Sequence, residues 1–329
     1  MEKERVCVTG AGGYQASWVV KLLLSKGYIV HGTVRQPSDE KNAHLNNLEN
    51  ATENLQLFKA DLLDYEGLCA AIAGCTGVFH VASPVIPYKV ENPQVQLLEP
   101  AVTGTLNVLK ASVEAKVKKV IVVSSIAAVQ HNPNWPKDKV MDESCWSDKE
   151  HCKKIESWYS ISKTEAETQA FEFAKKSNLD IVTVCPSIIV GPMLQPTMNA
   201  SSQFIPFIMK GGYQNISNEL RMFVDVRDVA EALLLVYLKP EAEGRYICLS
   251  HTVKTQEFQD KLMSLYPNYK YGNTFKAPDE DCLLSSEKLQ KLGWKFRSFE
   301  ETLVDAVQSY QKKGILETLQ VKVSSGKIN

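Results

Sequence analysis

The sequence predicts an α/β fold, with a doubly wound parallel sheet followed by a smaller mixed α/β domain. Short apolar, β-branched runs alternate with helical stretches over residues 1–190. This rhythm is typical of parallel strands covered by helices on both faces. A glycine cluster at 10–13 follows the first run directly, and the chain of 329 residues is long enough for about two domains.

The elements of the first part follow from their residue patterns. The strand runs are rich in Val, Ile and Leu, as expected for strands buried on both faces. Between them, 18–25 and 105–115 carry apolar residues at helical spacing, and the stretch from Tyr159 to Asn178 contains neither Pro nor Gly. The predicted strands are 6–9, 29–34, 55–59, 78–81, 120–124 and 181–185.

The rhythm changes after Cys185, where Pro and Gly residues indicate irregular structure up to residue 212. Further on, the pattern predicts a strand at 222–226, a helix at 228–238 opened and capped by Asp228, a strand at 246–249 and a helix at 299–312. We therefore expect two domains. They are a nucleotide-binding domain of residues 1–190 and about 221–240, and a substrate domain of about 191–220 and 241–329.

Composition narrows the function classes. The formal net charge is -1, which argues against nucleic acid or an anionic membrane as the main partner. The N-terminus has no signal-peptide pattern, and no apolar run approaches the ~20 residues of a membrane span, so a cytoplasmic protein is expected. The eight cysteines include no C-x-x-C pair and are expected to be reduced thiols. A redox role for Cys145 and Cys152 stays open, and no histidine spacing predicts a metal site.

The glycine cluster predicts a dinucleotide site. A strand, a glycine-rich turn and a helix in immediate succession let the backbone approach a pyrophosphate, and the helix N-terminus adds free N–H groups. The sheet is therefore expected to be of the Rossmann type. Gln15 is unusual, because an apolar side chain would normally pack the helix onto the sheet here. Predicted contacts in this loop are Gly10, Gly12, Gly13, Tyr14, Gln15 and Ala16.

Other strand ends complete the predicted cofactor site. Arg35 follows the second strand and Lys41 lies six residues on. These two cations suit a 2′-phosphate and favour NADPH over NADH, although a solvated loop with unrelated charges is the alternative. Further contacts are expected from Asp61 and Leu62 with the adenine, and from Val81, Ala82 and Ser83 with the nicotinamide ribose.

Tyr159 and Lys163 predict the chemistry. Four residues apart, they share one face of the expected helix, where an ammonium can lower the pKa of a phenol. A second Tyr-x-x-x-Lys pair at Tyr266 and Lys270 is interrupted by Pro267 and predicts a turn. Ser125 ends the fifth strand beside the expected nicotinamide. Together, Ser125 can hold a carbonyl oxygen and Tyr159 can protonate it while hydride is delivered. Lys163 can also bind the nicotinamide ribose, so Tyr159 and Lys163 are both expected to contact the cofactor.

These features accompany several longer motifs. They are VTGAGG at 8–13, GTVR at 32–35, FHVASP at 79–84, DESCWSD at 142–148, WY at 158–159 with SK at 162–163, GP at 191–192 and EGRYIC at 243–248. In this combination the chain resembles the extended short-chain dehydrogenases/reductases, and among them the plant cinnamoyl-CoA reductases, dihydroflavonol reductases and aromatic aldehyde reductases. The resemblance implies an NADP-dependent oxidoreductase with Ser125, Tyr159 and Lys163 as catalytic residues. It also implies that Pro186 and Ile189 contact the nicotinamide.

Local departures from this pattern bear on the substrate. Cinnamoyl-CoA reductases carry Asn-Trp-Tyr-Cys-Tyr-Gly-Lys around the catalytic tyrosine, whereas this chain has SWYSISK at 157–163. They also tend to have a histidine after Asn-Ala-Ser, where this chain continues with SQF at 202–204. Both departures favour a phenylpropanoid aldehyde as substrate, as in short-chain cinnamyl-alcohol dehydrogenases of plant lignin biosynthesis. The pocket is expected to include Ile126, Gln130, Ser187, Met193, Gln203, Phe204 and Phe223.

Other functions remain open from sequence alone. Reduction of a CoA thioester would need cations for the CoA phosphates, and Lys210 and Arg221 are available. A dihydroflavonol-type ketone is a further possible substrate. A protein that senses NADPH without turnover belongs to a different class, and the complete set of Ser125, Tyr159 and Lys163 argues against it. The oligomeric state, monomer or homodimer, and the preferred direction of reaction are not decided by the sequence.

Overall fold

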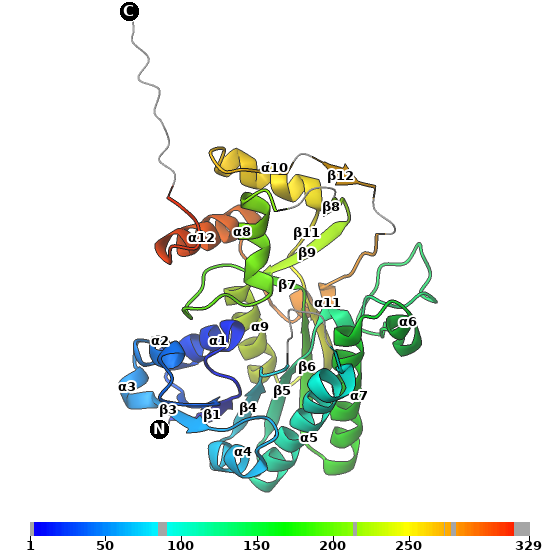
Figure 1. The fold of residues 1–329 in the computed structure, drawn as a ribbon. Coiled ribbons are helices and arrows are strands. Elements are labelled where there is room, and N and C mark those ends of the chain that lie inside the picture. The colour runs from blue at the N-terminus through cyan, green and yellow to red at the C-terminus, as the bar shows by residue number, and fades with distance from the viewer. Residues whose placement is uncertain (1–2, 85–90, 213–215, 273, 278–280, 319–329) are drawn as a thin grey trace, which may run out of the picture.

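The computed structural model describes residues 3–84, 91–212, 216–272, 274–277 and 281–318. A seven-stranded, fully parallel sheet forms its centre, which confirms the predicted fold class (Figure 1). Each of the six strands predicted in the first part lies within one residue of its expected bounds. In spatial order the strands are β3 (Leu55–Lys59), β2 (Ile29–Val34), β1 (Arg5–Val8), β4 (Gly77–His80), β5 (Lys119–Val123), β6 (Asp180–Pro186) and β10 (Gly244–Cys248).

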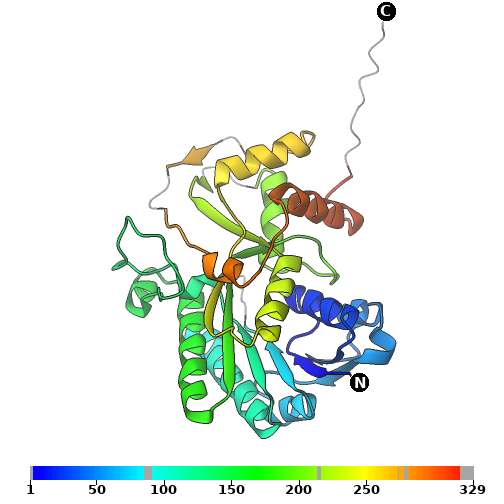
Figure 2. The ribbon, with the colours of Figure 1, turned by 180° about the vertical axis from the view of Figure 1, so that it is seen from behind.

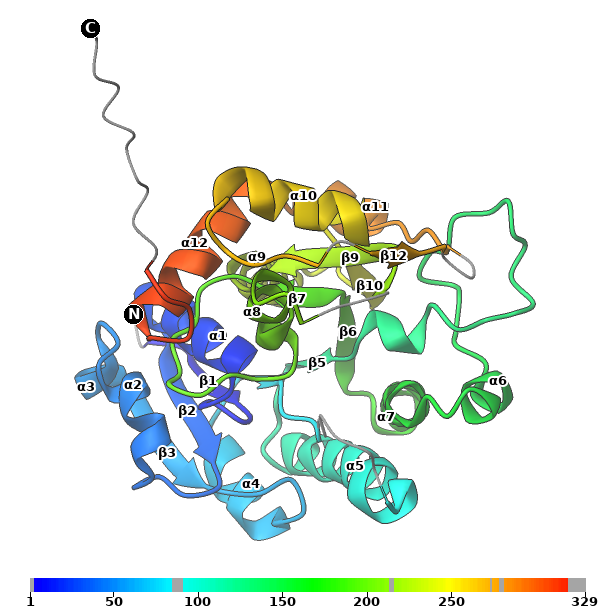
Figure 3. The ribbon, with the colours of Figure 1, turned by 45° about the horizontal axis from the view of Figure 1, so that its top comes forward.

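Helices cover both faces of this sheet (Figures 2 and 3). Alternate residues of a strand point to opposite faces. In β1, Val6 and Val8 enter one core and Cys7 enters the other. The first face carries α1 (Tyr14–Ser25), α2 (Ala43–Asn46), α3 (Ala51–Asn54) and α9 (Val226–Leu238); the second carries α4 (Tyr65–Ile72), α5 (Glu99–Glu114) and α7 (Trp158–Ser177), with α6 (Lys149–Lys154) packed against α7.

The second part of the chain has its own core. Figure 1 shows α8, α10 and α12 grouped with β9 and β11 above the main sheet. Phe223, Phe258 and Tyr310 are fully buried among them. The elements are β7 (Ile188–Val190), β9 (Leu220–Asp225) and β11 (His251–Lys254) in one sheet, β8 (Ile216–Ser217) with β12 (Phe275–Lys276), and the helices α8 (Phe204–Met209), α10 (Thr255–Leu265) and α12 (Phe299–Lys312).

The two expected domain boundaries differ from the structure at β9 and β10. β9 was expected in the nucleotide-binding domain, but it pairs with β7 and β11 in the small sheet. β10 was expected in the substrate domain, but it pairs with β6 and extends the main sheet, with α11 (Glu287–Lys291) beside it. The reason is connectivity: α9 packs on α1, and the short segment 239–243 returns the chain directly to the sheet edge.

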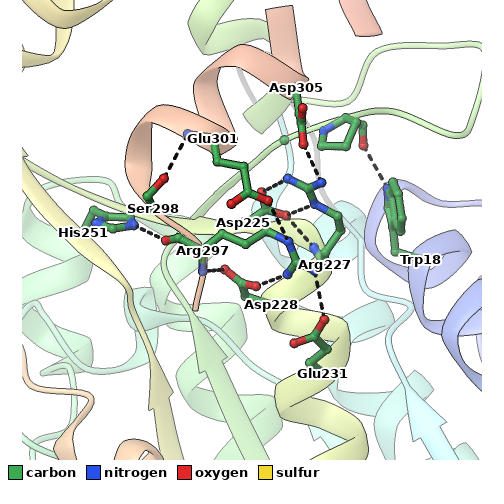
Figure 4. Close-up of polar contacts among 12 residues, drawn as sticks. Trp18, Asp225, Arg227, Asp228, Glu231, His251, Arg297, Ser298, Glu301 and Asp305 are labelled. Carbon is green, nitrogen blue, oxygen red and sulfur yellow. Dashed lines mark hydrogen bonds and ion pairs between the residues drawn. The ribbon is translucent and has the colours of Figure 1, made fainter. Parts of the chain in front are cut away.

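A polar network joins the two parts at the start of α9 (Figure 4). Asp225, rather than the expected Asp228, caps this helix by accepting a hydrogen bond from the Arg227 N–H at 2.8 Å. The Arg227 guanidinium also pairs with Asp225 and, at 2.6 Å, with Asp305 of α12. Asp228 instead accepts hydrogen bonds from the backbone and side chain of Arg297. The network therefore ties α12 and the segment before it to the helix that packs on the main sheet.

Asp228 gives a testable pH dependence of stability. Burial is the main cause that raises its pKa to about 6, although Arg297 lowers it. Because the folded protein holds this proton more tightly than the unfolded chain, the contribution to stability is greatest below about pH 4 and falls as the pH rises towards 6. Relative to Asp228→Asn, the wild-type free energy of unfolding is expected to fall by about 2 kcal/mol between pH 4.5 and 7. Urea denaturation at several pH values measures this difference, and a pH-independent difference would contradict it.

Within the described ranges, no helix is both long and apolar enough to cross a membrane. The same residues contain no group of three or more His, Cys, Asp or Glu side chains arranged to hold a metal ion. All eight cysteines are free thiols.

Candidate active site

The carboxyl ends of the central strands open into a cleft of about 2510 Å³. Parallel sheets bind ligands at this edge. All but two of the predicted site residues line the cleft. Those present are Gly10, Gly12, Gly13, Tyr14, Gln15, Ala16, Arg35, Lys41, Asp61, Leu62, Val81, Ala82, Ser83, Ser125, Ile126, Gln130, Tyr159, Lys163, Pro186, Ser187, Ile189, Gln203 and Phe204.

Met193 and Phe223 were expected in the substrate pocket and do not line it. Met193 packs in the core of the second part, where its backbone N–H donates to Ser309 of α12. Phe223 is fully buried against Phe204 and Phe258. Leu220, Arg221 and Met222, which precede Phe223 on β9, line the cleft in its place.

The glycine loop forms a cradle at the N-terminus of α1. Gly10 has a φ of +66°, and a Cβ there would lie 2.9 Å from the Ala82 Cβ, so only glycine fits without strain. Gly13 caps α1 without a side-chain hydrogen bond, and the first turn carries no acidic residue. The N–H groups and the positive dipole end at the N-terminus of α1 therefore face the cleft without a competing carboxylate.

The end of β2 places Arg35 and Lys41 at the cleft. Lys41 Nζ lies 2.6 Å from Asp39, and this hydrogen bond holds the pKa of the Asp39 carboxyl below its usual range. Asn42, which the sequence analysis missed, is buried between this turn and the glycine loop and also lines the cleft. An isolated asparagine after a charged turn carries no periodic signal that could have identified it.

Thr9 shapes the turn after β4 and was also missed. Its hydroxyl oxygen accepts hydrogen bonds from the N–H groups of Val81 and Ala82, both at 3.0 Å, and contacts His80 Nδ1. Burial, with a smaller effect of Lys163, lowers the pKa of His80 to about 3. The ring is therefore neutral at working pH and acts as a structural link rather than an acid or base.

Ser125, Tyr159 and Lys163 converge as predicted. Ser125 starts the short turn η3 (Ile126–Ala128), and its hydroxyl accepts a hydrogen bond from the Ala127 N–H at 3.1 Å. Lys163 Nζ donates to the Val123 carbonyl of β5 at 3.2 Å and lies 5.8 Å from the Tyr159 ring centre. The end of β5 and the first turns of α7 thus form one wall of the cleft. Tyr266 of the second Tyr-x-x-x-Lys pair comes directly after α10, where Pro267 predicted a turn.

The protonation states of this group suit proton donation. Burial raises the pKa of Tyr159 above its ordinary value, and the Ser125 hydroxyl only partly offsets this. The phenol is therefore protonated at neutral pH. Burial also lowers the pKa of Lys163 to about 8, while the charge of Glu167 raises it. The ammonium form therefore predominates at pH 7.

The residues of the cleft fit a nicotinamide dinucleotide. Among the described residues, Gln15 Nε2 and Ser187 Oγ are buried polar atoms without a hydrogen-bond partner, and both residues line the cleft. Gln15 lies by the free N-terminus of α1, and Ser187 follows Pro186 at the end of β6. Buried polar atoms are normally hydrogen-bonded, so a polar ligand along this path would satisfy both.

The family follows from this arrangement and from comparison with known proteins. The model of the NAD dependent epimerase/dehydratase family matches residues 6–248. The chain belongs to this family. Cinnamoyl-CoA reductase 2 of Medicago truncatula is 46% identical over 319 residues, which cover 95% of this chain and 93% of that protein.

Two solved structures are similar over the same extent. Vestitone reductase from alfalfa (Medicago sativa L.) has a TM-score of 0.83 and 33% identity, with 95% of this chain and 100% of that chain covered. The yeast methylglyoxal/isovaleraldehyde reductase Gre2, solved with NADPH, has a TM-score of 0.77 and 26% identity, with 95% and 100% covered. The protein is therefore an oxidoreductase that uses a nicotinamide cofactor.

Arg35 is expected to discriminate between the two nicotinamide cofactors. If its guanidinium binds a 2′-phosphate, Arg35→Ala should weaken NADPH binding about 10- to 100-fold and leave NADH binding nearly unchanged, since hydrogen bonds to charged groups contribute about 1.5–3 kcal/mol. Dissociation constants from cofactor fluorescence measure both. Arg221→Ala, at another part of the cleft, is the matched control. An unchanged NADPH preference would remove Arg35 from the phosphate site.

Proposed function

We propose that the chain is an NADPH-dependent reductase that converts a hydroxycinnamoyl-CoA thioester to the corresponding aldehyde. The observation that carries this proposal is the 46% identity to a cinnamoyl-CoA reductase over 95% of the chain. The departures at 160–162 and 202–204 favoured an aldehyde substrate. They involve few positions, however, and the comparisons favour the thioester alternative over that first interpretation.

The size and lining of the cleft support a large second ligand. At about 2510 Å³ it exceeds the ~300–1,000 Å³ typical of a drug-sized ligand, which leaves room beside a dinucleotide. Arg221 and Lys139 line it and offer cations for CoA phosphates, whereas Lys210 does not line it. Arg221 already pairs with Glu219 at 2.5 Å, and Lys139 lies 4.7 Å from the centre of the Trp135 ring. These cations are therefore partly held in place before any ligand binds.

The catalytic residues then act on the thioester carbonyl. When bound, NADPH supplies a hydride. Ser125 holds the carbonyl oxygen by a hydrogen bond, and Tyr159 donates a proton to it as negative charge develops. Lys163 stabilises the resulting phenolate through its positive charge. Collapse of the tetrahedral adduct breaks the carbon–sulfur bond, so that one thioester, one NADPH and one proton give one aldehyde, one NADP⁺ and free CoA thiol.

A substrate panel tests this assignment. NADPH oxidation is followed with feruloyl-CoA, coniferaldehyde, phenylacetaldehyde and a dihydroflavonol, and CoA release is measured with a thiol reagent. We expect kcat/KM for feruloyl-CoA to exceed that for coniferaldehyde by about tenfold or more, or about 1.4 kcal/mol in transition-state binding, with one thiol released per NADPH. Preference for coniferaldehyde would overturn the proposal in favour of the alcohol dehydrogenase function.

A further inference from the structure

A buried ion pair between Glu167 of α7 and Arg245 of β10 lies behind the catalytic wall. Arg245 Nε lies 2.9 Å from Glu167 Oε1, and Nη2 lies 3.1 Å from Oε2, so the contact is bidentate. The Arg245 side chain is 6% exposed and the Glu167 side chain 0%. Burying two charges is costly unless the geometry is good and further hydrogen bonds satisfy both groups. Both side chains make such further hydrogen bonds, and these connect the pair to several parts of the site.

Glu167 holds the two strand ends that carry the site. Its carboxylate accepts hydrogen bonds from Ser124 Oγ at 2.8 Å and from the Thr183 hydroxyl, and it lies 3.6 Å from Cys185 Sγ. Ser124 directly precedes Ser125 on the β5 side, and Cys185 directly precedes Pro186 on β6. The Glu167 carboxylate thus links the position of Ser125 with that of Pro186, the predicted nicotinamide contact.

Arg245 holds the wall of the cleft that follows Ser125. Its guanidinium donates to the carbonyls of Cys145 at 2.6 Å, Glu143 at 3.1 Å and Ala128 at 3.2 Å. It also lies 3.6 Å from the centre of the Trp146 ring. These contacts and those with Glu167 use the N–H donors of the Arg245 guanidinium, which leaves none for a ligand. Arg245 therefore anchors the segment from η3 to Trp146 instead of contacting substrate.

Glu167 also stands one helical turn beyond Lys163, on the same face of α7. Its negative charge raises the pKa of Lys163, which burial lowers. The ionisable groups that face Lys163 from the surrounding elements are His80 of β4, Tyr159 and Glu167 of α7 and Cys185 of β6, with Arg245 of β10 behind Glu167. Among these, Glu167 carries the negative charge that favours the ammonium form, and its contacts with Arg245 and Ser124 orient it.

We propose that the Arg245–Glu167 pair is a positioning element of the carbonyl-reducing centre, which holds the ends of β5 and β6 and the segment 126–146 against α7 and places the Glu167 carboxylate one helical turn from Lys163. The proposal concerns the centre of any reductase built on these residues and is independent of the identity of the carbonyl substrate.

The charge-specific part is tested with Glu167→Gln, which keeps size and an acceptor but removes the charge. The matched control is Glu165→Gln on the same helix, whose carboxylate pairs with Lys149 at 2.8 Å and takes no part in the buried network. We expect the high-pH limit of kcat to move down by about one to two pH units in Glu167→Gln. The pH above which NADPH affinity declines should move with it. The Glu165→Gln profile should match the wild type, and a Glu167→Gln profile that also matches it would overturn the proposal.

The positioning part is tested with Arg245→Gln and with the double variant Glu167→Gln/Arg245→Gln. Loss of the anchor should raise KM for the carbonyl substrate about tenfold in both. The double variant should recover part of the thermal stability that Arg245→Gln loses, because no charge is left buried alone. If it also recovers the wild-type KM, the pair is only structural and the inference fails. Should Glu167→Gln not fold, the KM of the double variant still tests the positioning role. The NADPH titrations remain informative even if no member of the substrate panel is reduced.

Discussion

Tyr159→Phe is expected to lower kcat by about 10²- to 10⁴-fold, the usual contribution of a positioned general acid. Burial keeps the phenol of Tyr159 protonated at neutral pH, and Phe has the same shape but no proton to donate. Steady-state NADPH oxidation measures the loss. NADPH affinity, measured separately by fluorescence titration, should change by no more than about tenfold, since one lost hydroxyl contact is worth about 0.5–1.5 kcal/mol.

The chain supplies a matched control for this variant. Tyr266 belongs to the other Tyr-x-x-x-Lys pair and lies just beyond α10, away from the cleft. Tyr266→Phe should therefore retain the wild-type kcat. Substantial turnover by Tyr159→Phe would show that another group donates the proton, and the assignment of Tyr159 would have to be abandoned.

Phe258→Ala is expected to lower the free energy of unfolding by about 3–5 kcal/mol, as for other fully buried Phe residues. Phe258 is 0% exposed, and its ring centre lies 4.8 Å from that of Phe223 and 5.2 Å from that of Phe204. Truncation removes these ring contacts and a third with Phe299 at 5.9 Å, and it leaves a cavity that the surrounding helices and strand cannot fill. Urea denaturation followed by circular dichroism measures the loss.

Leu238→Ala is the control for this substitution. Leu238 ends α9 and is 56% exposed, so the change should stay within about 0.5 kcal/mol. A loss below 1 kcal/mol in Phe258→Ala would show that the aromatic core does not stabilise the second part of the chain.

Periodicity made the main sheet predictable. β1, β2, β4, β5 and β6 are short, largely apolar runs between turn signals, because both of their faces are buried. β3 lies at the edge of the sheet, and its residues are only partly buried or exposed. The helix at 299–312 was predicted with its observed bounds, since its apolar stripe faces one core and its other side is solvated. β10 was recognised as a strand, but its sequence cannot say which sheet edge it joins. That depends on α9 packing against α1.

The candidate site was predictable where local chemistry is distinctive. A glycine loop after a strand, cations after the next strand and a Tyr-Lys pair at helical spacing each carry their own signal, and all reach the cleft. Met193 and Phe223 were wrong because pocket residues were inferred from type and approximate position. The preceding residues of β9, Leu220, Arg221 and Met222, line the cleft, whereas Phe223 packs in the core of the second part.

The Tyr159–Lys163 pair shows most clearly what each level of description determined. By itself the sequence determined the chemical groups, their helical spacing and the strand ends they follow, because these depend on residues close together in the chain. Only the tertiary structure decided that Glu167 and Arg245, 78 residues apart, meet behind the pair and join the ends of β5 and β6 to the cleft wall. The physical reason is that a buried charge is tolerated only with a partner, and which residues become buried together is decided by the packing of the whole sheet.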